Sequence, residues 1–258
     1  MKRFHLVELE DLPGFPAYFR DYITDFLGFI VEQMDFYKGI PALIARGLSA
    51  TNSERIVDLA SGGGGGWPSL MGRVRTLRPD ATVLLTDRYP NHRAFDRLSE
   101  RQIPGLACHR EPVSATDVPV GLRGMRTLFL SFHHFSPEVA QGILQDGVRR
   151  GEAILIVEIQ TRSVADLLKN LCSPLAVMLA TPFIRPFRLG RLFWTYVVPV
   201  LPLVLGWDGV VSVLRSYRPE ELEAMVNGLD GGEGYSWEIA TDQSGKAPVH
   251  YMLGVPRG

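Results

Sequence analysis

The stretch IVDLASGGGGGWPSL, residues 56–70, decides the fold. β-Favouring residues lead to Asp58, and five consecutive glycines, Gly62 to Gly66, follow before Trp67 and Pro68. Glycine tolerates positive φ and lets another molecule approach the main chain closely, whereas proline favours the first turn of a helix. The apolar residues after Pro68 recur at helical spacing. The stretch therefore predicts a strand, a cofactor-binding glycine turn and a helix.

Spacing separates the cofactors that bind to such turns. The dinucleotide fingerprint requires a third glycine three positions after the second, but counted from Gly62 and Gly64 that position holds Trp67. A phosphate-binding Walker loop requires a Gly-Lys-Ser/Thr sequence, and no lysine is near. Diphosphate cofactors are therefore disfavoured. The alternative is an ordinary glycine-rich loop, although five glycines cost chain entropy on folding.

The acidic residue, the small residues and the Gly-x-Gly sequence resemble motif I of the class I S-adenosylmethionine (SAM) dependent methyltransferases. In this chain Ala60 replaces the usual first glycine of the motif. The resemblance implies an α/β, Rossmann-like fold with a seven-strand, mostly parallel sheet and helices on both faces, and it implies SAM as cosubstrate. The residues that it assigns to the cofactor in this turn are Asp58, Ala60, Ser61, Gly62 and Gly64.

A second feature supports an adenosine ligand. Residues 82–87, TVLLTD, predict a strand that ends in Asp87, with Arg88 in the turn that follows. A carboxylate at the tip of this strand can accept both ribose hydroxyls, and it lies about 20 residues beyond the glycines, as in nucleotide-binding folds. The resemblance places the adenine contact at Ser114 and Ala115, although the usual acid before the small residue is missing and Asp117 follows instead.

Residues 127–135, TLFLSFHHF, predict a fourth strand that runs into a histidine pair. Ser131 and His133 lie where the resemblance places groups near the cofactor. Imidazole titrates near neutral pH, so His133 or His134 can act as the base that deprotonates an acceptor. The alternative is that both histidines are hydrogen-bonded parts of the core. The pair gives no metal site, because adjacent residues of a strand cannot face one ion.

Two charged residues, Asp208 and Arg215, interrupt an apolar stretch, where a charge should be paired or functional. Arg215 can hold a substrate carboxylate, or it can pair with Asp208 as a structural strut, which is the preferred interpretation. Aromatic residues can also surround the sulfonium by cation–π attraction, although such residues are usually core. The aromatic candidates are Tyr22, Tyr37, Trp207 and Tyr217.

The chain divides into a helical cap, residues 1–52, and a SAM-binding domain, residues 53–258. Apolar spacing predicts a helix over residues 16–37, and a second short helix begins at Pro41. The domain contains an apolar insertion at about residues 162–217, which prolines cut into short helical pieces. We interpret the insertion as a lid over the active site that is walled by aromatic residues; a homodimer interface and a membrane-surface patch are the alternatives. The expected wall residues are Phe193, Trp194, Tyr196 and Trp207.

Composition limits the class of protein. A net charge of −1 gives no electrostatic case for nucleic acid. Two cysteines are compatible with a reducing cytoplasm, and the first 15 residues lack the pattern of a signal peptide. The longest uncharged run, residues 192–207, has 16 residues and two prolines, whereas a membrane-spanning helix needs about 20 apolar residues. We therefore expect a cytoplasmic enzyme with a small-molecule substrate.

Three functions fit this sequence. The first is a SAM-dependent methyltransferase that acts on a small, rather apolar acceptor in a closed pocket. The second is a methyltransferase-like SAM cyclase, in which the amino group of SAM attacks its own γ-carbon to give azetidine-2-carboxylate and methylthioadenosine. The third is a non-catalytic SAM-fold protein whose insertion binds a partner or a membrane. Fold resemblance alone does not choose between them, because function resides in the site.

Overall fold

The computed structural model describes residues 1–12 and 14–257. The chain divides into two compact units: unit 1 is Met1–Gln33 with Gln160–Arg218, and unit 2 is Met34–Ile159 with Pro219–Gly258. The expected insertion thus forms one unit with the beginning of the chain, while the glycine-rich stretch lies in the other. The roles of cap and lid, and the expected boundary at residue 52, stay predictions.

Unit 2 is built on a seven-stranded sheet with the order β3-β2-β1-β4-β5-β7-β6. The pairs among β1 to β5 are parallel, and β7 is antiparallel to both β5 and β6. The expected seven-strand, mostly parallel sheet is confirmed. The strands are β1 (Arg55–Asp58), β2 (Thr82–Leu85), β3 (Leu106–Cys108), β4 (Met125–Phe129), β5 (Ile154–Glu158), β6 (Tyr235–Asp242) and β7 (Val249–Pro256).

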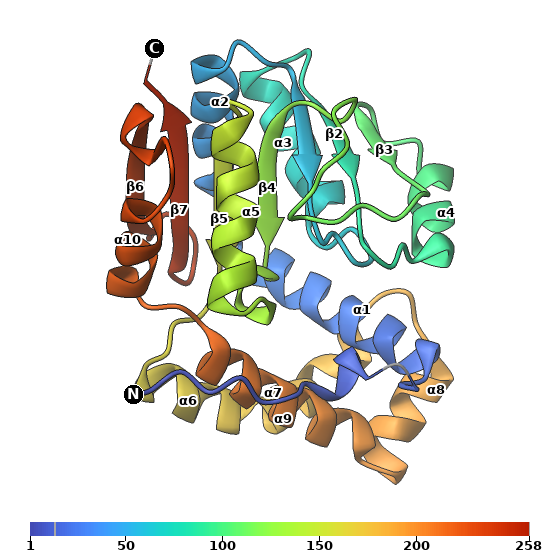
Figure 1. Cartoon of the computed structure of the whole chain (residues 1–258). Coiled ribbons are helices and arrows are strands. Elements are labelled where there is room, and N and C mark those ends of the chain that lie inside the picture. Colours follow the sequence, from blue (N-terminus) through green and yellow to red (C-terminus); the bar gives the residue numbers. More distant parts are fainter. Residues whose placement is uncertain (13, 258) are drawn as a thin grey trace. The chain divides into compact units, whose positions relative to one another are not determined.

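Helices cover both faces of this sheet. Figure 1 shows α5 and α10 in front of the sheet and α2 behind it. The helix starts follow local sequence: Pro41 and Pro68 lie in the first turns of α2 and α3, and the side chain of Ser136 accepts the N–H of Val139 to cap α5. The helices of unit 2 are α2 (Ile40–Ala50), α3 (Trp67–Leu77), α4 (His92–Glu100), α5 (Pro137–Arg149) and α10 (Pro219–Asn227).

The prediction that the histidine pair continues a strand is wrong. Strand β4 ends at Phe129, Leu130 has φ +51°, and His133 and His134 lie in the 3₁₀ turn η2 (Phe132–His134). The left-handed conformation at Leu130 turns the chain out of the sheet, which an unbroken apolar run does not reveal. The two imidazole rings do not point to opposite faces either, because their centroids lie 4.4 Å apart.

Unit 1 is helical. Its core contains aromatic residues of α1, such as Phe19 and Phe26, packed with Val177 of α7 and Leu201 of α9. The insertion consists of short pieces, as the prolines predicted. The elements are η1 (Leu9–Asp11), α1 (Ala17–Gln33), α6 (Val164–Leu171), α7 (Ser173–Ala180), η3 (Thr181–Phe183), α8 (Leu189–Leu192), η4 (Phe193–Val197) and α9 (Val200–Arg215).

Candidate active site

Most of the predicted site residues of unit 2 lie at the carboxyl ends of β1, β2 and β4. Strand β1 lies between β2 and β4, so the chain proceeds from β1 to one side of the sheet and from β4 to the other. Ligands of open α/β sheets bind outside the carboxyl ends of the strands where the strand order reverses. Ala60 and Leu130, the residues that follow β1 and β4 closely, both have positive φ, 53° and 51°. Such strained backbone clusters at functional sites.

The glycine turn leaves its main chain open at one position and crowded at another. Gly62 has φ +54°, and a Cβ atom there would have no heavy atom within 4 Å. Gly64 has φ +89°, and a Cβ atom there would lie 2.5 Å from Cδ1 of Leu98. Glycine is therefore required at Gly64 by packing and conformation, while Gly62 presents bare backbone that a ligand can approach.

Asp87 joins this turn to the end of β2. Its Oδ2 accepts the N–H of Gly62 at 2.8 Å, and its Oδ1 accepts the N–H of Tyr89 at 2.7 Å. The carboxylate is half-buried and each oxygen keeps a further lone pair, so it can still accept ribose hydroxyls. Arg88 is exposed, with its guanidinium 5.8 Å from the Tyr89 ring centroid.

The expected adenine segment is connected to the same corner. The N–H of Val113 donates to the carbonyl of Asp87 at 2.8 Å. Ser114 Oγ lies 3.0 Å from Thr116 Oγ1, and Ala115 is buried. This hydrogen bond places Ser114 and Ala115 next to the chain that follows β2, and their role as adenine contacts stays a prediction.

Asp58 is buried beneath the turn, with 2% of its surface exposed. Ser61 Oγ donates to Oδ2 and Thr127 Oγ1 donates to Oδ1, each at 2.6 Å. Burial raises the pKa of the Asp58 carboxyl to about 6, although these two hydrogen bonds favour the charged form. Asp58 therefore links β1, the glycine turn and β4 through its own side chain.

Tyr37 belongs to the same buried cluster. Its ring centroid lies 5.0 Å from that of Phe129, which in turn lies 5.3 Å from that of Trp67. Burial, together with the negative charges of Asp58 and Glu158, raises the pKa of Tyr37 well above its usual range. The phenol therefore stays neutral near physiological pH.

His133 is held by a carboxylate at the end of β5. Its Nδ1 lies 2.9 Å from Oε2 of Glu158, and its backbone N–H donates to Oε1 of the same residue at 3.2 Å. His133 is buried, whereas His134 is half-buried. The nearby Ser131 Oγ is buried without a hydrogen-bond partner among the described residues. A histidine fixed by a carboxylate is a usual arrangement for a general base.

Sequence reasoning missed Glu158 and Thr127. Glu158 ends the apolar strand β5, just as Asp87 follows β2, so the search for an acid at a strand end should have found it. Thr127 lies inside an apolar strand, where a hydroxyl needs a partner, and that partner is Asp58.

Five predicted site residues lie in unit 1, and within that unit their contacts are structural: Tyr22, Trp207, Asp208, Arg215 and Tyr217. Asp208 accepts the N–H groups of Leu9 and Glu10 at 2.6 and 3.3 Å, and burial raises its pKa to about 6. Arg215 lies 3.3 Å from Glu8 Oε1 and 2.9 Å from Asp11 Oδ2. The expected direct Asp208–Arg215 pair is therefore wrong, because each residue binds the N-terminal segment instead.

Trp207 donates to the carbonyl of Val7, and Tyr22 is part of the core.

Tyr217 and the expected lid residues also belong to unit 1. The guanidinium of Arg3 lies 4.3 Å from the Tyr217 ring centroid. Trp194 packs on Phe19, with ring centroids 5.3 Å apart, whereas Phe193 and Tyr196 are exposed. Their roles as lid or sulfonium contacts stay predictions.

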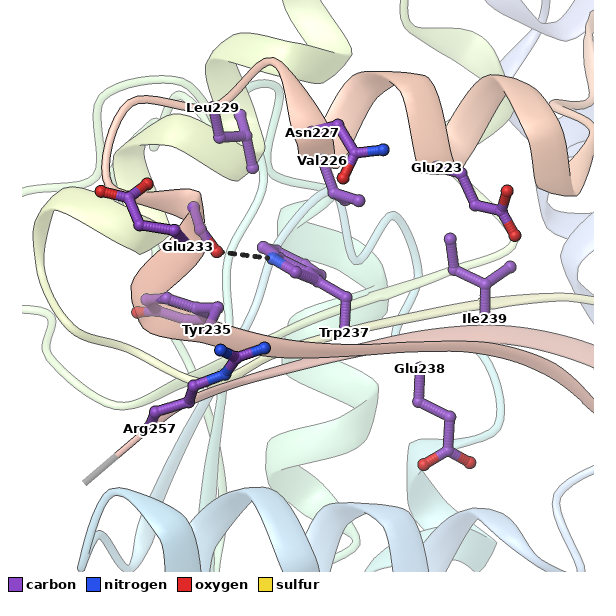
Figure 2. A pocket seen from close by; sticks show the side chains of 11 residues that line it. Glu223, Val226, Asn227, Leu229, Glu233, Tyr235, Trp237, Glu238, Ile239 and Arg257 are labelled. Atoms are coloured by element: carbon purple, nitrogen blue, oxygen red, sulfur yellow. Dashed lines mark hydrogen bonds between the residues drawn. The ribbon is translucent and has the colours of Figure 1, made fainter.

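A hollow of about 750 Å³ lies elsewhere on unit 2, between α10 and β6 (Figure 2). Trp237 faces it and donates to the carbonyl of Gly232 at 3.3 Å, and its ring stacks on Tyr235 with centroids 5.5 Å apart. Strands β4, β5 and β7 separate β6 from β1 in the sheet, so this hollow is distinct from the glycine turn.

No family model and no curated protein matches this sequence. Solved structures do match. The fold is similar to NcsB1, an O-methyltransferase from neocarzinostatin biosynthesis in complex with SAM and 2-hydroxy-5-methyl naphthoic acid: the TM-score is 0.54 and the identity 17% over 96% of this chain and 60% of NcsB1. The chain has the class I SAM-dependent methyltransferase fold.

Two further matches differ in length. The pyocyanin biosynthetic protein PhzM matches with a TM-score of 0.55 and 15% identity over 98% of this chain and 63% of PhzM. The plantazolicin methyltransferase BamL, in complex with a triazolic desmethylPZN analog and SAH, matches with a TM-score of 0.57. The identity is 12% over 92% of this chain and 91% of BamL. The chain thus spans about three fifths of NcsB1 and PhzM. Identities this low establish the shared fold alone.

Proposed function

We propose that this chain is a SAM-dependent methyltransferase that acts on a hydroxyl oxygen of a small, rather apolar acceptor. The observation that carries the proposal is the hydrogen bond between Gly62 and Asp87, which holds an open main-chain turn beside an acid at the strand-order reversal. The similarity to NcsB1, which was crystallised with SAM and a hydroxylated naphthoic acid, supports the same class of reaction.

SAM fits the residues present at this site. The bare backbone at Gly62 leaves space for the methionine part of SAM, and Asp87 can accept the ribose hydroxyls. Ser131 adds a buried hydroxyl that lacks a partner among the described residues and can bind a polar group of SAM. The negative charge of Asp58 suits a cationic sulfonium.

SAM supplies a methyl group that is already activated for transfer. The chain therefore has to hold the acceptor in line and to exclude water. When the Nδ1–H group of His133 donates a hydrogen bond to Glu158, Nε2 carries the lone pair of the neutral ring. Nε2 can then accept the proton of an acceptor hydroxyl. Glu158 fixes the orientation of the ring and stabilises the imidazolium that forms, so it acts as a positioning residue.

The His133–Glu158 pair favours methyl transfer over cyclisation of SAM, because cyclisation needs no base for a second substrate. The test is to incubate the protein with SAM alone and with SAM plus a panel of phenols and hydroxylated aromatic acids, and to identify the nucleoside product by mass spectrometry. S-Adenosylhomocysteine that forms only with an acceptor is the expected result. Methylthioadenosine from SAM alone would assign the cyclase reaction, and no product with any acceptor would count against catalysis.

A pair of variants assigns the base. His133→Ala should lower kcat by about 10²-fold or more, which is typical of the loss of a general base. His5→Ala is the matched control, because His5 is exposed and lies in unit 1. Equal activity of both variants would exclude His133 as the base.

A further inference from the structure

Unit 1 exposes far more large apolar side chains than unit 2. Among the described residues, fifteen exposed large hydrophobic side chains lie within residues 164–207, whereas unit 2 has four. Monomeric proteins rarely expose large contiguous apolar surface without an interaction partner. The four of unit 2 are Leu77, Tyr89, Val120 and Val139.

Six of the exposed residues in unit 1 follow one side of α6, α7 and η3. They are separated by four, three, four, four and four residues, the spacing of one helical face. Each is between 58% and 73% exposed, and the core of unit 1 is made by other residues, such as Val177 and Ala180. We call these six the α6–η3 face: Val164, Leu168, Leu171, Leu175, Leu179 and Phe183.

Basic residues outnumber acidic ones around this face. Residues 164–207 contain four basic residues and one acidic residue, Asp166, which pairs with Lys169 at 3.2 Å. Arg188 and Arg191 pair with Asp25 of α1, at 3.1 and 2.8 Å. Lys169 is exposed and pairs with Asp166 within α6, whereas Arg185, exposed two residues after Phe183, has no ionic partner among the described residues.

The hydropathy of these helices indicates which kind of partner the α6–η3 face binds. No single helix among the described residues is long and apolar enough to cross a membrane. Two bent helix pairs reach that apolar content together, Val164–Leu171 with Ser173–Phe183 at 46° and Leu189–Val197 with Val200–Arg215 at 80°. Helices with an exposed apolar side, aromatic residues and basic neighbours lie in the interface of a bilayer.

We propose that the α6–η3 face docks on an anionic lipid surface, with its apolar side chains in the interface and with Arg185 at the headgroups. The charge pattern favours lipid over a second copy of the chain. A symmetric contact between two copies would place Arg185 against a surface whose one acid within residues 164–207, Asp166, already pairs with Lys169. The proposal is independent of the catalytic assignment.

The test is sedimentation of the full chain with vesicles of phosphatidylcholine alone and of phosphatidylcholine mixed with phosphatidylglycerol. We expect binding to the mixed vesicles that weakens with salt. Leu179→Glu should weaken binding by at least tenfold, because it removes a large apolar contact and adds a negative charge. Arg185→Gln should weaken binding to anionic vesicles by about fivefold, the effect of one charge near the surface.

Matched variants control for charge and hydrophobicity. Leu77→Glu replaces a leucine that is 52% exposed on α3, and Arg101→Gln replaces an exposed arginine after α4; both should bind as the parent does. Circular dichroism verifies that Leu179→Glu is folded, and Arg185→Gln supplies a variant with no apolar change. No sedimentation with anionic vesicles, or equal sedimentation of all variants, would overturn the proposal. Concentration-dependent self-association that Leu179→Glu abolishes, without vesicle binding, would also overturn it and assign the face to a second copy.

Discussion

The N–H of Gly62 donates to Oδ2 of Asp87 over 2.8 Å, and the two residues are 25 positions apart in the sequence. The bond ties the open turn after β1 to the acid after β2, so one side chain both shapes the turn and remains available to a ligand. The cofactor site therefore depends on Asp87 in two ways.

Asp87→Ala should lower the affinity for SAM by about tenfold or more, because charge-assisted hydrogen bonds contribute about 1.5–3 kcal/mol. Isothermal titration calorimetry with SAM measures the effect. Asp96→Ala is the control, since Asp96 is an exposed acid of α4 that pairs with Arg110. Unchanged affinity in Asp87→Ala would contradict the adenosine assignment.

Glu158→Gln should lower kcat by roughly tenfold to a hundredfold and leave the dissociation constant for SAM nearly unchanged. The amide keeps the size of the side chain but removes the charge that orients His133 and stabilises its protonated form. Steady-state kinetics with a methyl acceptor, together with calorimetry, separates the two effects. A loss of SAM binding equal to the loss of kcat would point to a structural role.

Asp58 should make the protein less stable as the pH rises. Its pKa is raised from 3.8 to about 6 in the folded protein, so the folded state holds a proton that the unfolded state has lost between these values. The free energy of unfolding then falls by at most about 3 kcal/mol between these two pH values. Asp58→Asn lacks this titration. The difference in unfolding free energy between parent and variant should therefore change with pH over this window, and a constant difference would argue against the raised pKa.

Arg215→Met should destabilise unit 1 by about 3–5 kcal/mol, because it removes the guanidinium that lies 3.3 Å from the buried carboxylate of Glu8. It also removes the donor to the Leu6 carbonyl. Denaturant unfolding measures the effect, and Arg101→Met, at an exposed position, should change stability by less than about 0.5 kcal/mol. Equal stability of both variants would show that the N-terminal segment does not depend on Arg215.

Much of unit 2 could be predicted because its signals are local. The glycines, the acid at the end of an apolar strand and the prolines that begin helices each act within a few residues of the element they determine. The same local rules predicted a β4 strand that is too long. The chain turns at Leu130 in a left-handed conformation that leucine rarely adopts. An aliphatic residue gives no sign of such a turn.

The partners of the site residues were harder to predict, because they are distant in sequence. Thr127 reaches Asp58 across 69 residues, and Glu158 reaches His133 across 25. The preferred interpretation paired Asp208 with Arg215, because both charges interrupt one apolar stretch. Both instead bind residues near the N-terminus, about 200 positions away.

The hydrogen bonds between residues 1–12 and α9 have a consequence for biosynthesis. Leu6 and Arg215 are 209 positions apart, so the first residues leave the ribosome long before the helix that receives them. During that interval the apolar side of α1 lacks its partners from α7 and α9. The nascent chain therefore has to carry α1 unshielded, or under the protection of a chaperone, until translation passes residue 218.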